Sequence, residues 1–326
     1  MKFWIGFFTC LVTLSLVWIQ GLTSQLGTAT PTSRWVFDAY QLKLKAAEQI
    51  ATPKVLIVAG SNAMFGIDSK QLSAYWQRPT INLAVNAGLG LDYILAQAKK
   101  AARRGDIIIL PLEYALYLDD GDANSQIIDY VIGRDPLYWN SLTQYQKTQF
   151  ILGMAPERWI QGLRQPIDSP VNSGTYGTHH LDNVGDQTFS GREHQQEQDR
   201  AAIAIAASPK KAWRYGERAL QENGAWERLS QFSKWARQNQ LCVIAVPTAL
   251  LFHKSYKDSI VERRFYESIP DRVRSLDIPY VGKPFDFMYP ADHFFDTDHH
   301  LQDWARTIHT QRLIKQLRQS QPCSFR

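Results

Sequence analysis

The chain has 326 residues, which is enough for one large domain or two small ones. Its apolar content of 44% and charged content of 21% are those of an ordinary globular protein with a sizeable core. The net charge of +5 is modest, and the basic residues form no stripe with interleaved aromatic residues, so a nucleic-acid-binding protein is not expected.

The N-terminus is apolar. After Met1 and Lys2, residues 3–22 carry no charge and nearly reach the roughly 20 residues that a bilayer-spanning helix needs. A cleaved secretory signal is the alternative, but it would have a shorter apolar region, and residues 22–29 offer only a weak cleavage site. We therefore expect an uncleaved transmembrane anchor over residues 1–22, with Lys2 in the cytoplasm and the main domain outside it. Residues 23–33 are polar and predict a linker.

The next elements alternate between helix and strand. Residues 35–50 place apolar side chains on one helical face. Three short apolar runs, 55–59, 81–85 and 107–110, are typical of strands buried on both faces of a parallel sheet. Between the last two runs, residues 92–104 predict a helix that ends at Arg-Arg-Gly, a helix-stop signal.

The second half of the chain continues this alternation. An amphipathic helix around residues 226–235 precedes a strand at 241–246, a short strand is expected at 278–281, and a last helix is expected to start near residue 301, with Leu301, Trp304, Ala305 and Ile308 on one face. Strands alternating with helices predict a three-layer α/β/α fold with a parallel sheet over residues 34–326. Residues 114–208 interrupt the alternation, and we interpret them as a large insertion over the strand ends.

A serine and an acid–imidazole cluster carry the chemistry. Ser61 follows the first predicted strand, and Asp-Thr-Asp-His-His at 296–300 precedes the last helix. Ligands of a parallel α/β sheet bind at the carboxyl ends of its strands, so a residue that follows a strand is well placed for a site. We expect Ser61 to be a nucleophile, His300 its base and Asp296 the acid that orients the base, with Asp298 and His299 as alternates.

An acyl-transfer site also needs donors for a developing oxyanion. The backbone N–H of Ser61 and that of Gly88, which follows the second strand, are candidates. Glycine allows the backbone to approach a substrate closely. The side chains of Asn62 and Asn86 are further candidate donors.

These motifs resemble the SGNH (GDSL-like) hydrolase superfamily. Gly-Ser-Asn at 60–62, Asn-Ala-Gly at 86–88 and the cluster at 296–300 match its first, second and last blocks. The sequence of residues 295–301 is most similar to that of the membrane-anchored envelope branch. This branch includes the alginate O-acetyltransferases and the D-alanyl transfer protein of teichoic acid synthesis. The resemblance covers residues 54–115 and 285–318.

Two positions depart from the superfamily pattern. The third block usually carries Asn, whereas the corresponding strand end here carries Glu113, either as a site carboxylate or as a structural acid paired with an arginine. The last block usually places Asp three residues before His, which fits Asp296 and His299, whereas His300 followed by Leu301 better matches the residues around the catalytic histidine.

The resemblance implies a serine O-acyltransferase or esterase of the cell envelope that modifies a polysaccharide or another acylated envelope substrate. It implies no cofactor and no metal, and a transferase would use a membrane acyl-donating protein as partner. Three alternatives remain open: a non-catalytic protein that assists polysaccharide assembly or binding, a zinc site at 296–300, and Asp298 as a simple helix cap.

The three cysteines predict neither a disulfide nor a metal site. Cys10 lies in the apolar N-terminal run, Cys242 lies in a predicted strand, and Cys323 lies near the C-terminus. No pair is convincingly placed for a disulfide, and no spacing is typical of a metal site.

Overall fold

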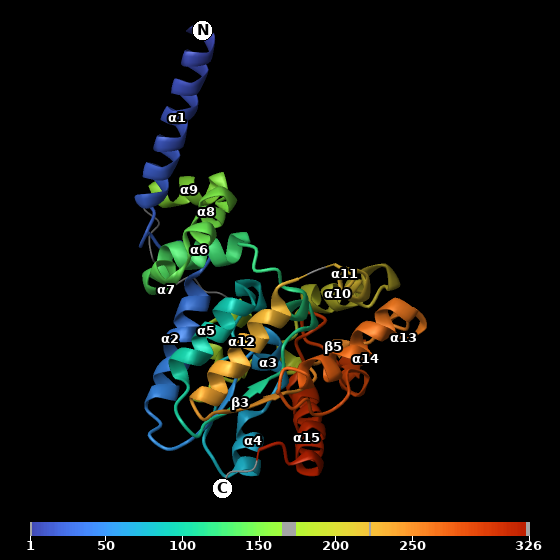
Figure 1. Ribbon diagram of the computed structural model, residues 1–326. Coiled ribbons are helices and arrows are strands. Elements are labelled where there is room, and N and C mark those ends of the chain that lie inside the picture. The colour runs from blue at the N-terminus through green and yellow to red at the C-terminus, as the bar shows by residue number, and fades with distance from the viewer. Residues whose placement is uncertain (1, 165–173, 222, 324–326) are drawn as a thin grey trace. The chain divides into compact units, whose positions relative to one another are not determined.

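Figure 1 shows the computed structural model, which describes residues 2–164, 174–221 and 223–323. The chain divides into two units. The smaller unit consists of residues 1–38 and 122–173, and the larger unit consists of residues 39–121 and 174–326. The expected insertion at 114–208 is thus divided between the units, because its residues 114–121 and 174–208 belong to the larger unit and its residues 122–173 to the smaller one.

The larger unit contains the predicted parallel sheet. Its four strands are β1 (Val55–Ile57), β2 (Thr80–Asn82), β3 (Ile107–Leu110) and β4 (Cys242–Ala245), in the order β2-β1-β3-β4. All three pairings are parallel. The side chains of β1, β2 and β3 are buried throughout, as expected for strands covered on both faces. The fold is therefore mixed α/β, while the three-layer arrangement stays a prediction.

The sheet extends only slightly beyond these strands. The strand expected at 278–281 is reduced to a single parallel bridge between Ala245 and Tyr280. A second, two-stranded parallel sheet, which was not expected, joins β5 (Leu250–Leu251) to β6 (Met288–Tyr289).

Helices flank the strands in sequence. The larger unit contains α3 (Ser61–Gly66), α4 (Ser69–Trp76), α5 (Gly90–Ala101), α10 (Glu197–Ala206), α11 (Tyr215–Arg218), α12 (Ala225–Gln238), α13 (Ser255–Asp258), α14 (Ile260–Arg274) and α15 (Asp303–Ser320). The helices expected at 92–104 and around 226–235 are confirmed as α5 and α12. The helix expected at 35–50 is confirmed as α2 (Arg34–Glu48), which crosses from one unit into the other.

The smaller unit is helical in its described part. It contains α1 (Lys2–Thr23), α6 (Ser125–Arg134), α7 (Pro136–Ser141), α8 (Gln144–Gly153) and α9 (Pro156–Leu163). Residues 23–33, the expected linker, contribute the buried side chains of Gln25 and Thr30 to this unit. Gln25 accepts a hydrogen bond from Arg158, and Thr30 donates one to Asp129, at 2.8 and 2.7 Å.

Helix α1 has the composition of a membrane span. Its segment Phe3–Gly21 is long and apolar enough to cross a bilayer, and none of that segment is buried inside the protein. A core helix of a soluble protein would be mostly buried, and this segment of α1 is not.

A disulfide corrects the expectation that no cysteine pair is placed to form one. Cys242, the first residue of β4, is bonded to Cys323, which follows α15. The two residues are 81 positions apart and have Cα atoms separated by 6.2 Å. The return of α15 to the sheet brings them together, and no local sequence signal reports such a return.

Candidate active site

A short loop ahead of α15 carries the acid and the imidazole. Phe294 and Leu301 form an antiparallel bridge, and the N–H of Phe295 donates to the carbonyl oxygen of His300 at 2.8 Å. The side-chain amide of Gln195, which lies outside this loop, donates a further hydrogen bond to the carbonyl oxygen of Phe295. Residues 296–300 are thereby confined to one tight turn.

The structure brings Ser61, His300 and Asp296 together. Ser61 is the first residue of α3, directly after the turn that ends β1. Its Oγ lies 2.8 Å from Nε2 of His300, and Nδ1 of His300 lies 2.7 Å from Oδ1 of Asp296. The distances are those of a nucleophile, a base and an orienting acid in hydrogen-bond contact.

The Asp296 carboxylate is kept ionised. Burial alone would raise the pKa of Asp296, but the charge and hydrogen bond of His300, together with a hydrogen bond from Tyr176, hold this pKa below its ordinary value. An ionised Asp296 accepts a hydrogen bond from the Nδ1–H group of His300, which leaves the lone pair of Nε2 directed at the Ser61 hydroxyl. This is the tautomer that a general base requires.

Phe65 fixes the plane of the imidazole. Its ring stacks on that of His300, with centroids 4.1 Å apart and planes 7° apart. Phe65 follows Ser61 by one turn of α3, so the same helix presents the nucleophile and supports the base.

Tyr176 is a site residue that the sequence analysis missed. Its hydroxyl donates to Oδ2 of Asp296 at 2.6 Å and lies 3.4 Å from Nδ1 of His300. Burial and the charge of Asp296 raise the pKa of Tyr176, so the phenol stays protonated and remains a donor. Tyr176 comes from a polar tract without helical or strand periodicity, where no signal distinguishes it.

Glu113 braces the nucleophile turn. Its two carboxylate oxygens accept the N–H groups of Gly60 and Asn62, at 3.1 and 3.2 Å. Burial raises the pKa of Glu113, partly offset by the charge of His299 and by the backbone hydrogen bonds. Among the described residues Glu113 has no ion pair with an arginine, so that expected role is wrong. The carboxylate instead holds the backbone on both sides of Ser61.

Gly60 shows that the loops after β1, β2 and β3 converge as expected. A Cβ at this position would lie 2.5 Å from the Cβ and the N of Ala87 and would collide with Oε1 of Glu113. Ala87 follows β2, and Glu113 follows β3. Only glycine fits where the three loops meet.

Two of the expected oxyanion donors, the N–H of Gly88 and the side-chain amide of Asn62, already have acceptors within the protein. The N–H of Gly88 donates to Oδ1 of Asn86 at 2.8 Å, so these two residues cap a short 3₁₀ turn. The amide of Asn62 donates to the carbonyl oxygen of Pro111 at 2.6 Å and to Thr248. The N–H of Ser61 is different, because the first residue of a helix has no acceptor within that helix.

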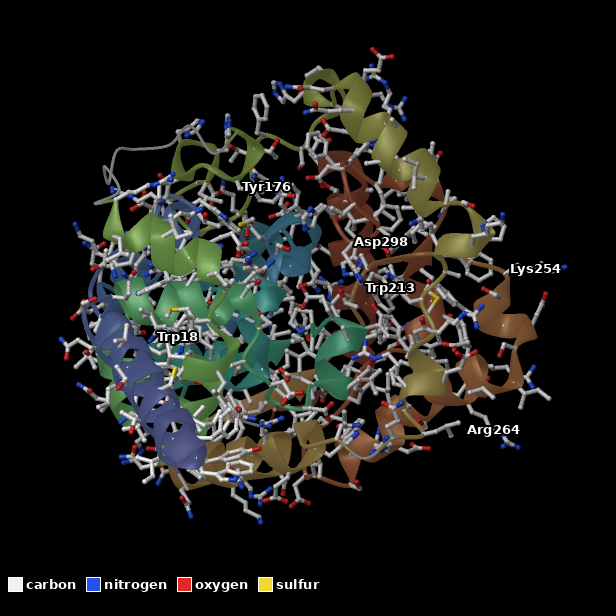
Figure 2. All side chains as sticks on the ribbon, turned by 90° about the horizontal axis from the view of Figure 1, so that it is seen from above. Trp18, Tyr176, Trp213, Lys254, Arg264 and Asp298 are labelled. Atoms are coloured by element: carbon white, nitrogen blue, oxygen red, sulfur yellow. A yellow bond between two sulfur atoms is a disulfide. The ribbon has the colours of Figure 1, made fainter. Side chains whose placement is uncertain are left out.

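The alternate acid and base have other contacts. Oδ2 of Asp298 accepts the indole N–H of Trp213 at 2.5 Å, and Figure 2 shows the two residues side by side. Nδ1 of His299 lies 3.2 Å from the carbonyl oxygen of Ala249. Asp298 also does not cap the last helix, because α15 begins at Asp303 with Gln302 as its N-cap.

Neither a metal site nor a similar protein identifies the function of this site. Within the ranges that the structure describes, no three His, Cys, Asp or Glu side chains are grouped so that they could hold a metal ion. No family model, no curated protein and no solved structure matches this chain.

Proposed function

We propose that this chain transfers or hydrolyses acyl esters through a covalent intermediate on Ser61. The observation that carries the proposal is the 2.8 Å contact between Ser61 Oγ and His300 Nε2, with Asp296 on the other ring nitrogen. A serine hydroxyl without such a base is a weak nucleophile at neutral pH, and a positioned imidazole contributes about 10²–10⁴-fold.

The reaction proceeds in two halves. His300 takes the Ser61 proton as Oγ attacks the acyl carbon, and the Ser61 N–H stabilises the oxyanion. The tetrahedral intermediate collapses, Nε2 returns the proton to the leaving alcohol, and Ser61 remains acylated. Water or an acceptor hydroxyl then attacks the acyl carbon and gives its proton to His300. The bond between the acyl carbon and Ser61 Oγ breaks, the acyl group leaves as the free acid or the new ester, and His300 returns the proton to Oγ.

The proposal extends to the family, the three-layer arrangement of the fold and the class of substrate. The SGNH-like motifs at residues 60–62, 86–88 and 296–300 support a three-layer SGNH-like domain of the membrane-anchored envelope branch. Such a protein acts on a cell-envelope polysaccharide and, as a transferase, receives its acyl group from a membrane protein.

We also propose that α1 anchors the protein in the membrane and that the larger unit lies outside the cytoplasm. The apolar segment Phe3–Gly21 supports the anchor. The Cys242–Cys323 disulfide supports the location, because disulfides persist in oxidising compartments and are rare in the cytosol.

Ser61→Ala tests the catalytic proposal. With p-nitrophenyl acetate as probe, we expect kcat to fall on the order of 10⁶-fold or to the solution background, as in other serine triads, and the acetylated protein to disappear from intact-mass spectra. Ser125→Ala is the matched control, because Ser125 is also the first residue of a helix and is exposed.

Adding a chito-oligosaccharide acceptor separates transfer from hydrolysis, since only a transferase moves the acetyl group to the sugar. Unchanged turnover and unchanged acylation in Ser61→Ala would contradict the proposal and leave the non-catalytic assembly role.

A further inference from the structure

The last turns of α1 pack against α8 and α9. The indole N–H of Trp18 donates to the carbonyl oxygen of Ile151 at 3.2 Å, and the rings of Trp18 and Trp159 lie 5.5 Å apart. A Cβ at Gly21 would lie 2.6 Å from the Trp159 ring, so the helices touch at this point. Figure 1 shows α8 and α9 beside the end of α1 that is remote from the N-terminus.

The length of α1 sets the depth of this contact. The segment Phe3–Gly21 has 19 residues, or about 28 Å at ~1.5 Å per residue, close to the ~30 Å thickness of a hydrocarbon core. Trp18 lies one turn before the end of the segment, at the level where tryptophan is enriched in membrane helices. Groups that contact Trp18 therefore lie at the boundary between acyl chains and headgroups.

Apolar side chains are exposed next to these contacts. Leu152, which follows Ile151, is 76% exposed, and Ile160, which follows Trp159, is 44% exposed. Leu163 is 59% exposed and lies three residues after Ile160, on the same face of α9.

The opposite face of α9 is buried within the smaller unit. Arg158 and Gly162 lie against Gln25, which accepts a hydrogen bond from the Arg158 guanidinium. The α9 helix thus has an inner face that binds the chain following α1 and an outer face that is apolar. This is the pattern of a helix lying in a membrane interface.

We propose that Leu152, Ile160 and Leu163 form an interfacial surface that inserts into the bilayer spanned by α1. The occupant is lipid because the surface continues the exposed apolar surface of α1 at the depth of Trp18. The exposed Arg164, directly after Leu163, is placed to extend toward lipid phosphates. The inference rests on α1 spanning the membrane and is independent of Ser61 chemistry.

Depth-resolved fluorescence tests the surface. In full-length Cys10→Ser protein, single substitutions Leu152→Cys, Ile160→Cys and Leu163→Cys are labelled with NBD and reconstituted in phosphatidylcholine–phosphatidylglycerol vesicles. We expect a blue-shifted emission and a loss of intensity with lipids carrying a nitroxide near the headgroup, and a smaller loss with a nitroxide deep in the acyl chain. Ile205→Cys on α10 is the matched control, since Ile205 and Leu163 are both 59% exposed.

Two outcomes would overturn the proposal. Emission and quenching equal to those of Ile205→Cys at all three positions would place the surface in water. A blue shift without quenching by either lipid, growing with the protein-to-lipid ratio, would assign the surface to a protein partner or a second copy. Neither outcome affects the acylation assay of Ser61, so this inference and the proposed function fail separately.

Discussion

At the scale of single residues, the Asp296 carboxylate is shared between two donors. Oδ1 binds His300, and Oδ2 binds the Tyr176 hydroxyl. The second bond stabilises the negative charge without competing for the imidazole, and a hydrogen bond to a charged group contributes about 1.5–3 kcal/mol. Tyr176 therefore acts as a positioning residue through Asp296.

Tyr176→Phe removes this donor and keeps the ring. Because the hydrogen bond favours the ionised carboxylate, its loss raises the pKa of Asp296, and we expect the part of the acid limb that reports protonation of Asp296 to move to higher pH. At about 1.4 kcal/mol per tenfold, the lost bond predicts a fall in kcat/KM of roughly tenfold or more. Profiles of kcat/KM against pH for the variant and the wild type check both effects.

The control is Tyr289→Phe. The Tyr289 hydroxyl lies 3.1 Å from Nδ1 of His309, a buried tyrosine–histidine contact that does not involve Asp296. This variant should leave the acid limb in place. Tyr176→Phe profiles that coincide with those of Tyr289→Phe would show that the phenol has no influence on Asp296.

At the scale of elements, a buried lysine joins three segments of the larger unit. Lys43 of α2 donates from Nζ to the carbonyl oxygen of Ala84, just after β2. Gly185, with φ of +91°, packs on the Lys43 side chain, where a Cβ would lie 3.0 Å from Cγ. Burial lowers the pKa of Lys43 to about 7, although Asp186 and Asp182 oppose this shift.

Lys43→Met predicts a characteristic pH dependence of stability. The folded pKa of about 7 is below the ordinary 10.5, so the contribution of the wild-type lysine is complete above pH 10.5 and is lost as pH falls toward 7. Methionine does not titrate. The free energy of unfolding of the variant, relative to wild type, should therefore rise as pH falls through this window.

Urea denaturation at several pH values measures this difference. Lys70→Met is the control for removing a lysine, because the Lys70 side chain is 73% exposed. A difference between Lys43→Met and wild type that stays constant across the window would contradict the buried, neutralised amine.

At the scale of the whole molecule, the disulfide ties the C-terminus to the sheet. Cys242 and Cys323 are separated by 81 residues, and closing a loop of that length restricts the unfolded chain by about 4 kcal/mol in the entropic model. We expect Cys323→Ser to lower the free energy of unfolding by about 2–4 kcal/mol under non-reducing conditions.

Thiol titration gives an independent readout of the same variant. Unfolded wild-type protein should react at Cys10 alone, and unfolded Cys323→Ser should react at Cys10 and Cys242. Cys10→Ser should leave the stability of the larger unit unchanged. Equal thiol counts in the unfolded wild type and Cys323→Ser would show that the disulfide does not form. The location in an oxidising compartment would then lose its support.

Several features of the fold could be predicted because their signals are local. Apolar runs bounded by turn residues identify β1 and β3. The length and apolar composition of α1 identify a candidate membrane span. The pairing of Ser61 with His300 was predictable from the order of the motifs at 60–62 and 296–300, and the rule that ligands bind at the carboxyl ends of parallel strands placed Ser61 itself.

The sequence alone thus determined the alternation of helices and strands, the apolar N-terminal helix and the residue types available to a serine site, because these depend on neighbours within a few positions. Four contacts depend on how the chain folds in space: Asp296 rather than Asp298 lies against His300, Gly88 donates to Asn86, Tyr176 donates to Asp296, and Cys242 is bonded to Cys323. The physical reason is that a hydrogen bond or disulfide joins groups that folding brings within a few ångströms, whatever their separation along the chain.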